Sequence, residues 1–403
     1  MEGDFIKINE WLLPLSWLYG IGVRFRNFLF DVGIRKSHAF SLPVISVGNI
    51  TVGGTGKTPH VEYLVRLLQT QGRVAVLSRG YKRKSRGFVL ADASSTVSDI
   101  GDEPCQMKHK FPDAVVAVDA KRVRAIQRLT ADNPDIDAIL LDDAFQHRQV
   151  KPGINILLVD YHRLVVYDKL LPAGRLREPL RGKNRADIVI VTKCPKMLMP
   201  MEYRVLTKAM DVYPYQQLYF TTTRYEALRL LFGDATREVA DIRADEHVLL
   251  LTGIASPRQL EEDLKALLNS PTSQLPNSPS PHTPAVTPLI FPDHHAFRKK
   301  DVERINRTFA ALPSPKCIIT TEKDAVRLSA VEGLSDEVRQ HLYVLPVTIE
   351  FMLNQEEKFN ENILGYVRKN SRNSILAKKK DDHQPRDSHR PGNGTRTISF
   401  RNC

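Results

Sequence analysis

The sequence predicts an α/β fold: a mostly parallel sheet wrapped by helices, joined to a second, smaller α/β lobe and preceded by an N-terminal membrane-interacting helix. Three observations support this prediction. Short apolar runs alternate with helical patterns through the first half of the chain, and a glycine-rich turn directly follows the first of these runs. A second alternating series begins after about Tyr213. The first 40 residues contain an uncharged apolar stretch followed by arginines.

At 403 residues, of which 42% are hydrophobic, the chain is long enough for two lobes. Residues 1–40 are expected to form the membrane-interacting segment, 41–212 the P-loop core and 213–369 the smaller lobe. Within that lobe, 270–288 is dense in Pro, Ser and Thr and is predicted to be a flexible insertion. Residues 370–403 are polar, basic and nearly without aliphatic side chains, so we expect a disordered tail.

The N-terminal segment is apolar but too short to cross a bilayer. Trp11 to Val23 carries no charge, and Arg24 and Arg26 end the run before it reaches the roughly 20 apolar residues of a spanning helix. The acidic residues before it argue against a signal peptide. Its aromatic and arginine side chains favour a peripheral or monotopic helix that lies in the membrane surface, and the alternative is an ordinary core helix.

Six apolar runs in the first half are predicted to be buried strands. They are Val44 to Val47, Val74 to Leu77, Val115 to Val118, Ala138 to Leu141, Ile154 to Val159 and Ile188 to Val191. In the second lobe we expect strands at Val248 to Leu251, Ile318 to Ile319 and Tyr343 to Val347, and helices at Arg258 to Leu268 and Asp301 to Leu312. His60 to Leu68 is apolar at helical spacing and supplies the helix after the glycine turn.

The glycine-rich turn has the form of a phosphate-binding P-loop, which makes the first lobe a P-loop NTPase-type core. Its residues are Thr51, Val52, Gly53, Gly54, Thr55, Gly56, Lys57 and Thr58. Glycines let the backbone curl around phosphate oxygens, Lys57 adds charge for the β and γ phosphates of ATP, and Thr58 offers a hydroxyl to Mg²⁺. Thr51 stands where the usual pattern has glycine, so we expect a slightly unusual loop geometry. The competing interpretation is a glycine turn that merely precedes Lys-Thr.

Two pairs of acids indicate phosphoryl transfer. Asp142 and Asp143 follow an apolar strand, the position from which a P-loop protein holds Mg²⁺ or its water shell. Because neighbours on a strand point to opposite sides, one of them is expected to touch the metal while the other supports it. Asp102 and Glu103 lie at a predicted helix start. Either one of them accepts the proton of an acceptor hydroxyl, or the pair only caps the helix and complements its dipole.

The remaining candidates are basic or imidazole groups. His294 follows an aspartate and can tune a catalytic base or bind phosphate, although a surface histidine pair also explains it. Arg177 belongs to a loop with Gly, Pro and a further Arg, which suits phosphate recognition or is simply a turn. The run from Arg73 to Leu90 holds six basic residues and no acid. That run favours either an anion site or a solvated loop.

Seven motifs follow one another in order along the chain. They are Val47-Gly-Asn-Ile-Thr-Val-Gly-Gly-Thr-Gly-Lys-Thr-Pro59, Leu77-Ser-Arg-Gly-Tyr-Lys-Arg83, Gly101-Asp-Glu-Pro104, Leu141-Asp-Asp-Ala-Phe-Gln-His-Arg148, Leu171-Pro-Ala-Gly-Arg-Leu-Arg-Glu-Pro-Leu180, Phe291-Pro-Asp-His294 and Thr321-Glu-Lys-Asp-Ala325. Together they resemble the tetraacyldisaccharide 4'-kinase family, the lipid A 4'-kinases of Gram-negative bacteria, over roughly Pro14 to Val347. The resemblance implies a P-loop kinase that transfers the γ-phosphate of ATP to the 4'-hydroxyl of an acylated glucosamine disaccharide 1-phosphate. It also implies work at the cytoplasmic face of the bacterial inner membrane, against its lipid surface.

The resemblance further implies roles for individual residues. Lys57 and Thr58 match the phosphate and Mg²⁺ ligands, and Asp102 matches the general base, with His294 as its dyad partner. The acidic shell around metal and substrate corresponds to Glu103, Asp142, Asp143 and Glu178. Substrate contacts are expected from Arg79, Arg83, Arg177 and Glu178, of which Arg79 and Arg83 lie where an anionic head group favours positive charge. Ala144 departs from the glycine that relatives often have after the paired acids.

Two other functions are less compatible with the residues. A P-loop GTPase switch needs a guanine reader of the form Asn-Lys-x-Asp, and the segments at Thr192 and Thr321 both fail that pattern. A nucleic-acid-binding ATPase is suggested by the net charge of +12, but the tail from Arg368 contributes ten Lys or Arg against three Asp. We therefore expect no nucleic acid as a partner, and no obligatory protein partner is evident.

Overall fold

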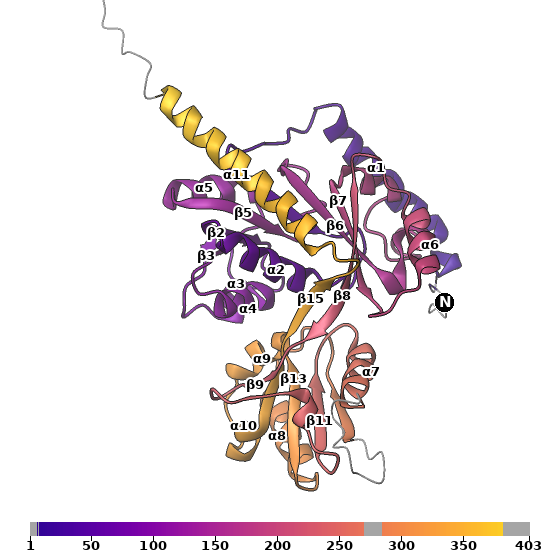
Figure 1. Ribbon diagram of the computed structural model, residues 1–403, viewed down its shortest axis with the longest axis vertical. Helices are drawn as coiled ribbons and strands as arrows, with labels where there is room; N and C mark the ends of the chain where they lie inside the picture. The colour runs from indigo at the N-terminus through magenta and orange to yellow at the C-terminus, as the bar shows by residue number, and fades with distance from the viewer. Residues whose placement is uncertain (1–5, 7, 270–283, 382–403) are drawn as a thin grey trace, which may run out of the picture.

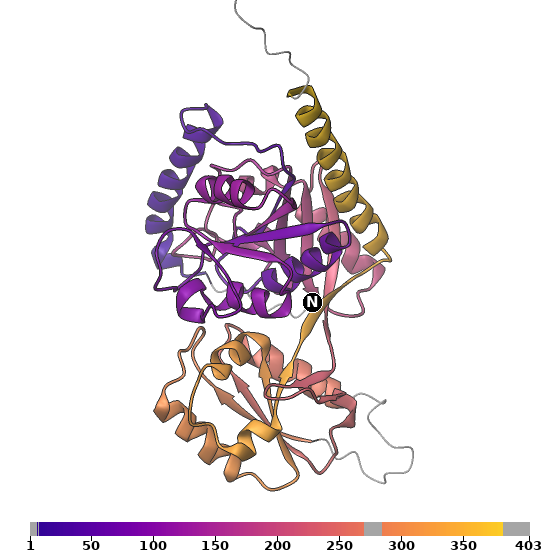
Figure 2. The same cartoon turned by 90° about the vertical axis from the view of Figure 1, so that its left-hand side faces the viewer.

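The computed structural model describes residues 6, 8–269 and 284–381, which form two lobes of unequal size. The larger lobe carries both the N-terminal helix and the long C-terminal helix, and the smaller lobe lies at one end of it (Figure 1). A view turned by 90° shows the same two bodies joined by a narrow connection (Figure 2). The predicted division into a large and a small α/β lobe therefore agrees with the architecture.

A nine-stranded sheet forms the centre of the large lobe, in the order β15-β8-β7-β6-β1-β5-β2-β4-β3 for the described residues. Its strands are β1 (Val44–Gly48), β2 (Arg73–Ser78), β3 (Val89–Leu90), β4 (Val115–Val118), β5 (Ile136–Asp142), β6 (Ile154–Asp160), β7 (Ile188–Cys194), β8 (Gln217–Tyr225) and β15 (Val347–Phe351). The strands from β8 to β4 are parallel, and only the edge strands β15 and β3 run antiparallel. All six strands predicted for this lobe are confirmed.

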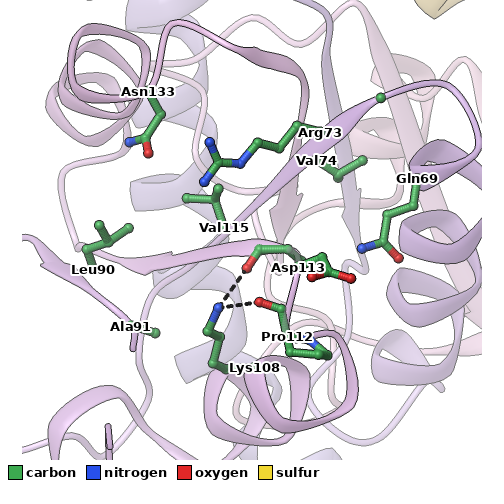
Figure 3. Close-up of a pocket in the computed structure, with 12 residues that line it drawn as sticks. Gln69, Arg73, Val74, Leu90, Ala91, Lys108, Pro112, Asp113, Val115 and Asn133 are labelled. Carbon is green, nitrogen blue, oxygen red and sulfur yellow. Dashed lines mark hydrogen bonds between the residues drawn. The ribbon is translucent and has the colours of Figure 1, made fainter. Parts of the chain in front are cut away.

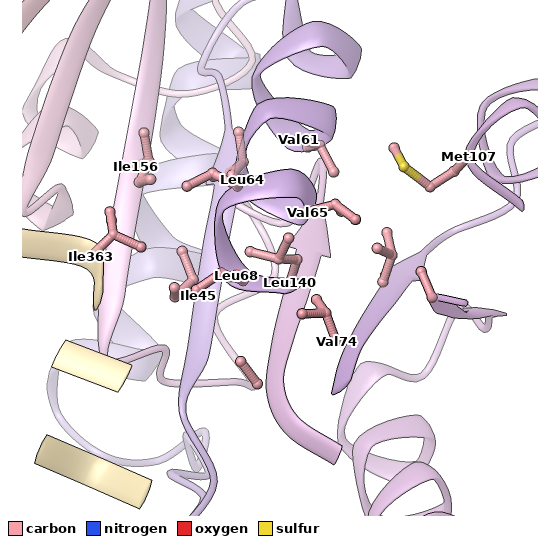
Figure 4. Close-up of a cluster of buried hydrophobic side chains, with 14 of the residues drawn as sticks. Ile45, Val61, Leu64, Val65, Leu68, Val74, Met107, Leu140, Ile156 and Ile363 are labelled. Atoms are coloured by element: carbon pink, nitrogen blue, oxygen red, sulfur yellow. The ribbon is translucent and has the colours of Figure 1, made fainter. Parts of the chain in front are cut away.

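Helices cover both faces of this sheet, because successive side chains of each buried strand point to opposite faces. One face packs against α2 (Lys57–Gln69), α4 (Asp102–Lys110) and α11 (Glu356–Asp381). Figure 4 shows Val61, Leu64, Val65 and Leu68 of α2 beside Ile45, Leu140 and Ile156 of the strands, with Met107 and Ile363 nearby. The other face is covered by α5 (Arg122–Asp132) and α6 (Pro200–Met210). This arrangement holds the P-loop end of α2 rigidly against the sheet.

The small lobe is built on a six-stranded sheet, in the order β10-β9-β14-β13-β11-β12 among the described residues. Its elements are β9 (Leu228–Leu230), β10 (Thr236–Arg237), β11 (His247–Thr252), α7 (Pro257–Leu268), β12 (Ala285–Ile290), α8 (Lys299–Ala310), β13 (Lys316–Thr321), α9 (Glu322–Ser329), α10 (Asp336–His341) and β14 (Leu342–Leu345). Buried side chains on both faces of this sheet form its own hydrophobic core. The two helices predicted for this lobe are confirmed as α7 and α8, and two of its predicted strands are confirmed as β11 and β13.

The boundaries of the small lobe differ from the expected 213–369. β8 and β15 lie in that range but pair antiparallel with each other at the edge of the large sheet, and α11 packs on the large lobe. The expected strand Tyr343 to Val347 is likewise two strands, because β14 ends at Leu345 and β15 begins at Val347 in the other sheet. Pro346 between them has no N–H to continue a ladder, so the chain changes sheets there.

Two predictions of irregular structure were partly wrong. The insertion 270–288 falls mostly outside the described residues, but its last part belongs to β12, which pairs with β11 at the edge of the small sheet. An edge strand tolerates Pro288 because one side of its backbone needs no partner. The tail 370–403 was expected to be disordered, yet α11 runs on to Asp381, and 382–403 lie outside the described residues. Lys and Ala are good helix formers, so the basic composition did not prevent the helix.

The N-terminal helix α1 (Leu13–Asp31), which follows the 3-10 turn η1 (Glu10–Leu12), lies on the surface of the large lobe (Figure 1). Its large apolar side chains are mostly exposed. Its buried residues are Ser16 and Gly20, whereas Trp11 is 93% and Trp17 is 79% exposed. A core helix would bury its aromatic side chains instead. Among the described residues, no helix has the length and apolar character needed to cross a membrane.

Candidate active site

The P-loop joins the centre of the large sheet to the first turn of α2. β1 runs between β5 and β6, parallel to both, so the loop leaves the carboxyl edge of the sheet with a strand on each side. Gly56 is the residue before α2 and has φ +74°, a left-handed conformation that a side chain disfavours. Lys57 and Thr58 open the helix, where the free N–H groups and the helix dipole favour phosphate. The predicted strand, loop and helix all occur.

The structure explains why threonine can occupy position 51, where the usual P-loop pattern has glycine. It is buried and forms an antiparallel bridge with Leu176, and the N–H of Val52 donates to the carbonyl of Arg175 at 2.8 Å. Thr51 is not among the described residues with positive φ, so this position needs no glycine. The start of the loop is therefore held as a short strand against the segment that contains Arg177.

The two acids at the end of β5 lie beside the P-loop but have different surroundings. Lys57 Nζ is 3.8 Å from Asp143 Oδ1, and the Arg177 guanidinium donates to Asp143 Oδ2 at 3.1 Å. Although burial opposes it, these two cations lower the pKa of Asp143. Asp142 is buried, and burial together with the carboxylates of Glu103 and Asp143 raises its pKa. Of the two acids, only Asp143 forms ion pairs among the described residues.

Glu103 completes this acidic group from the N-terminal turn of α4. Lys323 Nζ, on α9 of the small lobe, donates to Glu103 Oε1 at 2.7 Å. Burial opposes it, but Lys323 and Lys57 lower the pKa of Glu103. Within the described ranges, no set of three or more His, Cys, Asp or Glu side chains could enclose a metal ion unaided. Mg²⁺ usually takes only one or two carboxylates with water and phosphate oxygens, and a hydroxyl at Thr58 with carboxylates beside the P-loop fits that habit.

Asp102 and His294 meet although 192 residues separate them. His294 Nδ1 lies 2.7 Å from Asp102 Oδ2, and a nitrogen that close to a carboxylate carries the proton and donates it. Arg327 donates to the same oxygen from Nε at 3.0 Å and from Nη2 at 2.5 Å. Burial raises the pKa of Asp102, but the hydrogen bonds from His294 and Arg327 outweigh it and hold the value at about 2. Asp102 is thus ionised at neutral pH.

Asp102 does not cap its helix, which answers one of the alternatives raised by the sequence. The residue before α4 is Gly101, with φ +92°, and no side chain caps this end of the helix. A Cβ at Gly101 would lie 2.9 Å from the carbonyl oxygen of Tyr81. The glycine lets the 79–87 loop approach the helix start, and the Asp102 carboxylate is left to face the small lobe.

The other predicted substrate residues differ in exposure and in their bonding partners. Arg79 is exposed, whereas Arg83 donates to the carbonyls of Gly87 at 2.5 Å and Val118 at 3.4 Å and so anchors its own loop. Glu178 is 1% exposed and accepts from Arg185 Nη2 at 2.8 Å. Glu178 therefore lies in a buried ion pair, and it also accepts from Gln146 Nε2 at 3.0 Å.

The N-terminal helix docks directly on loops of the site. Ser16 Oγ donates to the carbonyl of Leu170 at 2.9 Å, and the Tyr19 hydroxyl donates to the carbonyl of Arg177 at 2.6 Å. Arg26 donates to the carbonyl of Gln146 at 2.8 Å, three residues after Asp143. The inner face of α1 thus binds the loops of the site. Anything that binds the outer face of α1 would therefore lie close to the catalytic residues.

One cavity of the large lobe is remote from this chemistry. It measures about 720 Å³ and is lined by residues such as Gln69, Arg73 and Asn133 at the amino end of β2 (Figure 3). Its lysine, Lys108, already donates to the carbonyls of Pro112 at 2.7 Å and Ala114 at 3.2 Å. None of the predicted site residues lines this cavity, so it takes no part in the candidate site.

Sequence reasoning missed the basic partners of the catalytic acids. Arg327 and Lys323 both lie on α9 and bond to Asp102 and Glu103 across the lobes. The only signal was the motif Thr321-Glu-Lys-Asp-Ala325, which contains Lys323 and stops two residues before Arg327. Nothing in the sequence says which distant acid a lysine or arginine will meet.

Comparison with known proteins gives consistent results. The model of the family described as tetraacyldisaccharide-1-P 4'-kinase matches residues 8–368. A Phocaeicola vulgatus protein named tetraacyldisaccharide 4'-kinase is 57% identical over 379 residues, covering 93% of this chain and 99% of that protein. A Bacteroides fragilis protein of the same name is 49% identical over 390 residues, covering 95% of this chain and 100% of that protein. A crystal structure described as the apo form of LpxK from Aquifex aeolicus in complex with ATP is similar with a TM-score of 0.66, at 28% identity, covering 88% of this chain and 98% of that one.

Proposed function

The chain belongs to the tetraacyldisaccharide-1-P 4'-kinase family and is an ATP-dependent tetraacyldisaccharide 4'-kinase of lipid A biosynthesis, and we propose that Asp102 and the P-loop perform its reaction together. The substrate is a tetraacyldisaccharide 1-phosphate, and the product carries a second phosphate on the 4'-oxygen. The observation that carries the proposed division of labour is the Asp102–His294 pair, 2.7 Å apart, to which each lobe contributes one residue.

Asp102 receives the proton of the 4'-hydroxyl. As that proton moves to the Asp102 carboxylate, the 4'-oxygen bonds to the γ-phosphorus, the bond from that phosphorus to the β–γ bridging oxygen breaks, and ADP leaves. His294 donates from Nδ1 and fixes the orientation of the carboxylate. A carboxylate with a pKa of about 2 is a weak base, so it orients the hydroxyl first and takes the proton late, which suits a loose transition state.

Lys57 and the loop amides hold the phosphates, since the start of α2 offers both charge and N–H groups. Thr58 and Asp142 are the residues we propose for Mg²⁺, with Glu103 and Asp143 in support. Asp142 is preferred because, among the described residues, its carboxylate accepts only the Ser78 hydroxyl, at 3.2 Å, whereas Asp143 is held by Arg177 and Lys57. Held there, Mg²⁺ would offset the negative charge of the ATP phosphates.

The exposed apolar side of α1 supports a peripheral position on the cytoplasmic face of the inner membrane. Trp11 of the preceding turn η1 is 93% exposed, and Trp17, Leu18 and Phe25 of α1 are 79%, 71% and 62% exposed. Aromatic and aliphatic side chains on one helix face enter the boundary between head groups and acyl chains. The protein then binds its acylated acceptor at the surface of the membrane that contains this lipid.

Vesicle flotation tests this location. Phosphatidylglycerol vesicles are expected to carry the wild-type protein upward, and the double variant Trp11→Ser, Trp17→Ser to remain below. Leu353→Ser, which removes an apolar side chain 54% exposed on another part of the large lobe, is the matched control. Equal flotation of all three proteins would contradict membrane contact through α1.

The reaction itself is tested by the transfer of ³²P from γ-labelled ATP to tetraacyldisaccharide 1-phosphate in detergent micelles. Labelled lipid with the wild-type protein, and none with Asp102→Ala, would support both the reaction and the base. Phosphate released to water with no labelled lipid would instead favour a P-loop hydrolase and contradict the proposed transfer.

A further inference from the structure

We infer that Arg327 is a positioning residue for phosphoryl transfer: from helix α9 of the small lobe it fixes Asp102 and His294 relative to each other. The inference rests on the proposed role of Asp102 as the base. Arg327 is buried, with 5% of its side chain exposed, and every nitrogen of its guanidinium has a partner in the site. A buried cation with this many bonds has a single available arrangement.

One side of the guanidinium holds the base. Nε donates to Asp102 Oδ2 at 3.0 Å and Nη2 donates to the same atom at 2.5 Å, where the His294 proton also arrives. All three donors therefore converge on Oδ2, and among the described residues no donor reaches Oδ1. The free oxygen is the one that can accept the proton of the sugar hydroxyl. Arg327 thus decides which of the two oxygens faces the acceptor.

The other side of the guanidinium holds the loop that carries His294. Nη1 donates to Asp324 Oδ1 at 3.0 Å and to the carbonyl of Gly253 at 3.3 Å. Asp324 Oδ2 in turn accepts from the Gly253 N–H at 2.9 Å, and the Gly253 carbonyl also accepts from the His294 N–H at 3.3 Å. Arg327 is therefore bonded to Gly253, which holds the His294 backbone, and to Asp324, which holds Gly253.

His294 needs this support because its backbone is strained. Its φ is +56°, a left-handed conformation that residues other than glycine rarely adopt. Such a conformation persists only where surrounding contacts specify it. Space is tight as well, since a Cβ at Gly253 would lie 3.0 Å from Asp324 Oδ1 and 3.2 Å from the Pro292 carbonyl oxygen.

Two further contacts on α9 keep the helix in register with α4. Lys323 donates to Glu103 Oε1 at 2.7 Å, and Lys110 of α4 donates to Glu322 Oε1 at 2.6 Å. With Arg327 and Asp102, three successive ion pairs cross between the lobes. Arg327 is the one of the three whose partner is the base itself.

The contact between Arg327 Nη2 and His294 Nδ1, at 3.5 Å, is not a hydrogen bond. Nδ1 already donates its proton to Asp102, and a guanidinium nitrogen has no lone pair with which to accept. The two donors lie side by side only because both bind Oδ2. The imidazole is therefore oriented by the carboxylate that Arg327 holds, and it receives no direct bond from Arg327.

The test uses the full-length protein and compares Arg327→Ala, Arg327→Lys and the control Arg243→Ala. Arg243 lies in the same lobe and pairs with Asp245 in a surface ion pair, its side chain 68% exposed. For Arg327→Ala we expect kcat for transfer to fall about 100-fold, the loss typical of a misplaced catalytic group, with KM for ATP within about twofold of wild type. Arg327→Lys should keep part of the rate, because the charge remains while the two-point contact is lost.

Guanidinium ion added to the assay separates positioning from stability. We expect it to raise kcat of Arg327→Ala severalfold at concentrations that leave the wild-type and Arg243→Ala rates and melting temperatures unchanged. An Arg327→Ala protein with wild-type kcat would overturn the inference. So would a loss of kcat that follows the melting temperature and that neither lysine nor guanidinium restores. If Arg327→Ala does not fold, the comparison of kcat and KM for Arg327→Lys decides, and a rise in KM alone would count against positioning. A wild-type protein that labels no lipid would instead refute the proposed function.

Discussion

The two halves of the active site are built in opposite ways. The phosphate half is one continuous segment, Thr51 to Thr58, between a strand and a helix of the large lobe. The acceptor half combines Asp102 from α4 with His294 and Arg327 from the small lobe, 192 and 225 residues away along the chain. A local motif can form its site from its own backbone, whereas the acceptor half exists only when two lobes are in register. The two halves should therefore respond differently to substitution.

The largest effect is expected from the acceptor half. Asp102→Ala should lower kcat by about 1,000-fold and change KM for ATP little, because the base acts in the transition state and lies outside the phosphate-binding loop. Steady-state ³²P transfer at varied ATP measures both constants. Asp99→Ala, which removes an exposed acid three residues earlier, is the control. Equal losses in ATP affinity and turnover would show that the two halves are not separable.

The phosphate half should lose about 100-fold or more in kcat on Lys57→Ala, since Lys57 stabilises charge on the transferring phosphoryl group. We expect KM for ATP to rise as well, in contrast to Asp102→Ala. The melting temperature should remain near that of wild type, because the one ion pair of Lys57 among the described residues is a 3.8 Å contact with Asp143. An unfolded Lys57→Ala protein would indicate a structural role and remove the contrast.

The same difference explains how much the sequence could predict. The parallel strands, the P-loop and the acids at the end of β5 follow from apolar runs and short-range spacing, and they are confirmed as elements of the fold. Asp102 and His294 were separate candidates in the sequence, their pairing was implied by the resemblance, and the structure brings them together. Arg327 was missed because its role depends on a contact with Asp102 in the other lobe, and no local sequence pattern predicts such a contact. The same limit left Arg185, the ion-pair partner of Glu178, unforeseen.

Lobe boundaries were predicted less well for a related reason. β8 and β15 look like ordinary strands of the second half, but they pair with each other at the edge of the first sheet. Only the pairing reveals this, since composition is the same in either sheet. The end of α11 was misjudged because a basic, aliphatic-poor sequence is compatible with both a helix and a disordered tail.

The contact between the lobes should also give stability its own pH dependence. Glu62 on α2 is buried, and Lys110 donates to it at 2.6 Å while also bonding to Glu322. Burial and the Glu322 carboxylate raise the pKa of Glu62 to about 7, so the folded protein binds a proton that the unfolded chain has released above its ordinary pKa of about 4.5. The Glu62 contribution to stability is therefore full at low pH and is lost as the pH rises from about 4.5 to about 7.

Glu62→Gln tests that sign. The variant keeps the side-chain shape without the titrating group. The difference in melting temperature, variant minus wild type, should therefore increase by a few degrees from pH 5 to pH 7.5. Glu357→Gln, an exposed position on α11, should follow the wild type at both pH values. A wild type that is stabilised relative to Glu62→Gln as the pH rises would show that the pair with Lys110 outweighs burial.

The smallest effect tests whether the phosphate half is as local as it looks. His60, on the first turns of α2, bonds to the Gly56 carbonyl through Nδ1 at 2.7 Å and to Thr221 Oγ1 on β8 through Nε2 at 3.0 Å. Burial lowers the pKa of His60 to about 4, so the ring is neutral; Nδ1 donates to the carbonyl and Nε2 accepts from the hydroxyl. β8 continues into the connection between the lobes, and the P-loop glycine is thus tied to that connection through one imidazole.

Thr221→Val keeps the volume and removes the hydroxyl. A lost buried hydrogen bond costs about 1 kcal/mol, so ATP binding should weaken by about fivefold if the tie holds Gly56 in its left-handed turn, with kcat changed less. Thr222→Val is the matched control, because the Thr222 hydroxyl donates to the Cys194 carbonyl at 2.7 Å, with no bond to the loop. Calorimetric ATP affinities that are equal in both variants would mean that the loop holds its own shape. A selective loss in Thr221→Val would mean that even the local half of the site depends on the strand that leads to the other lobe.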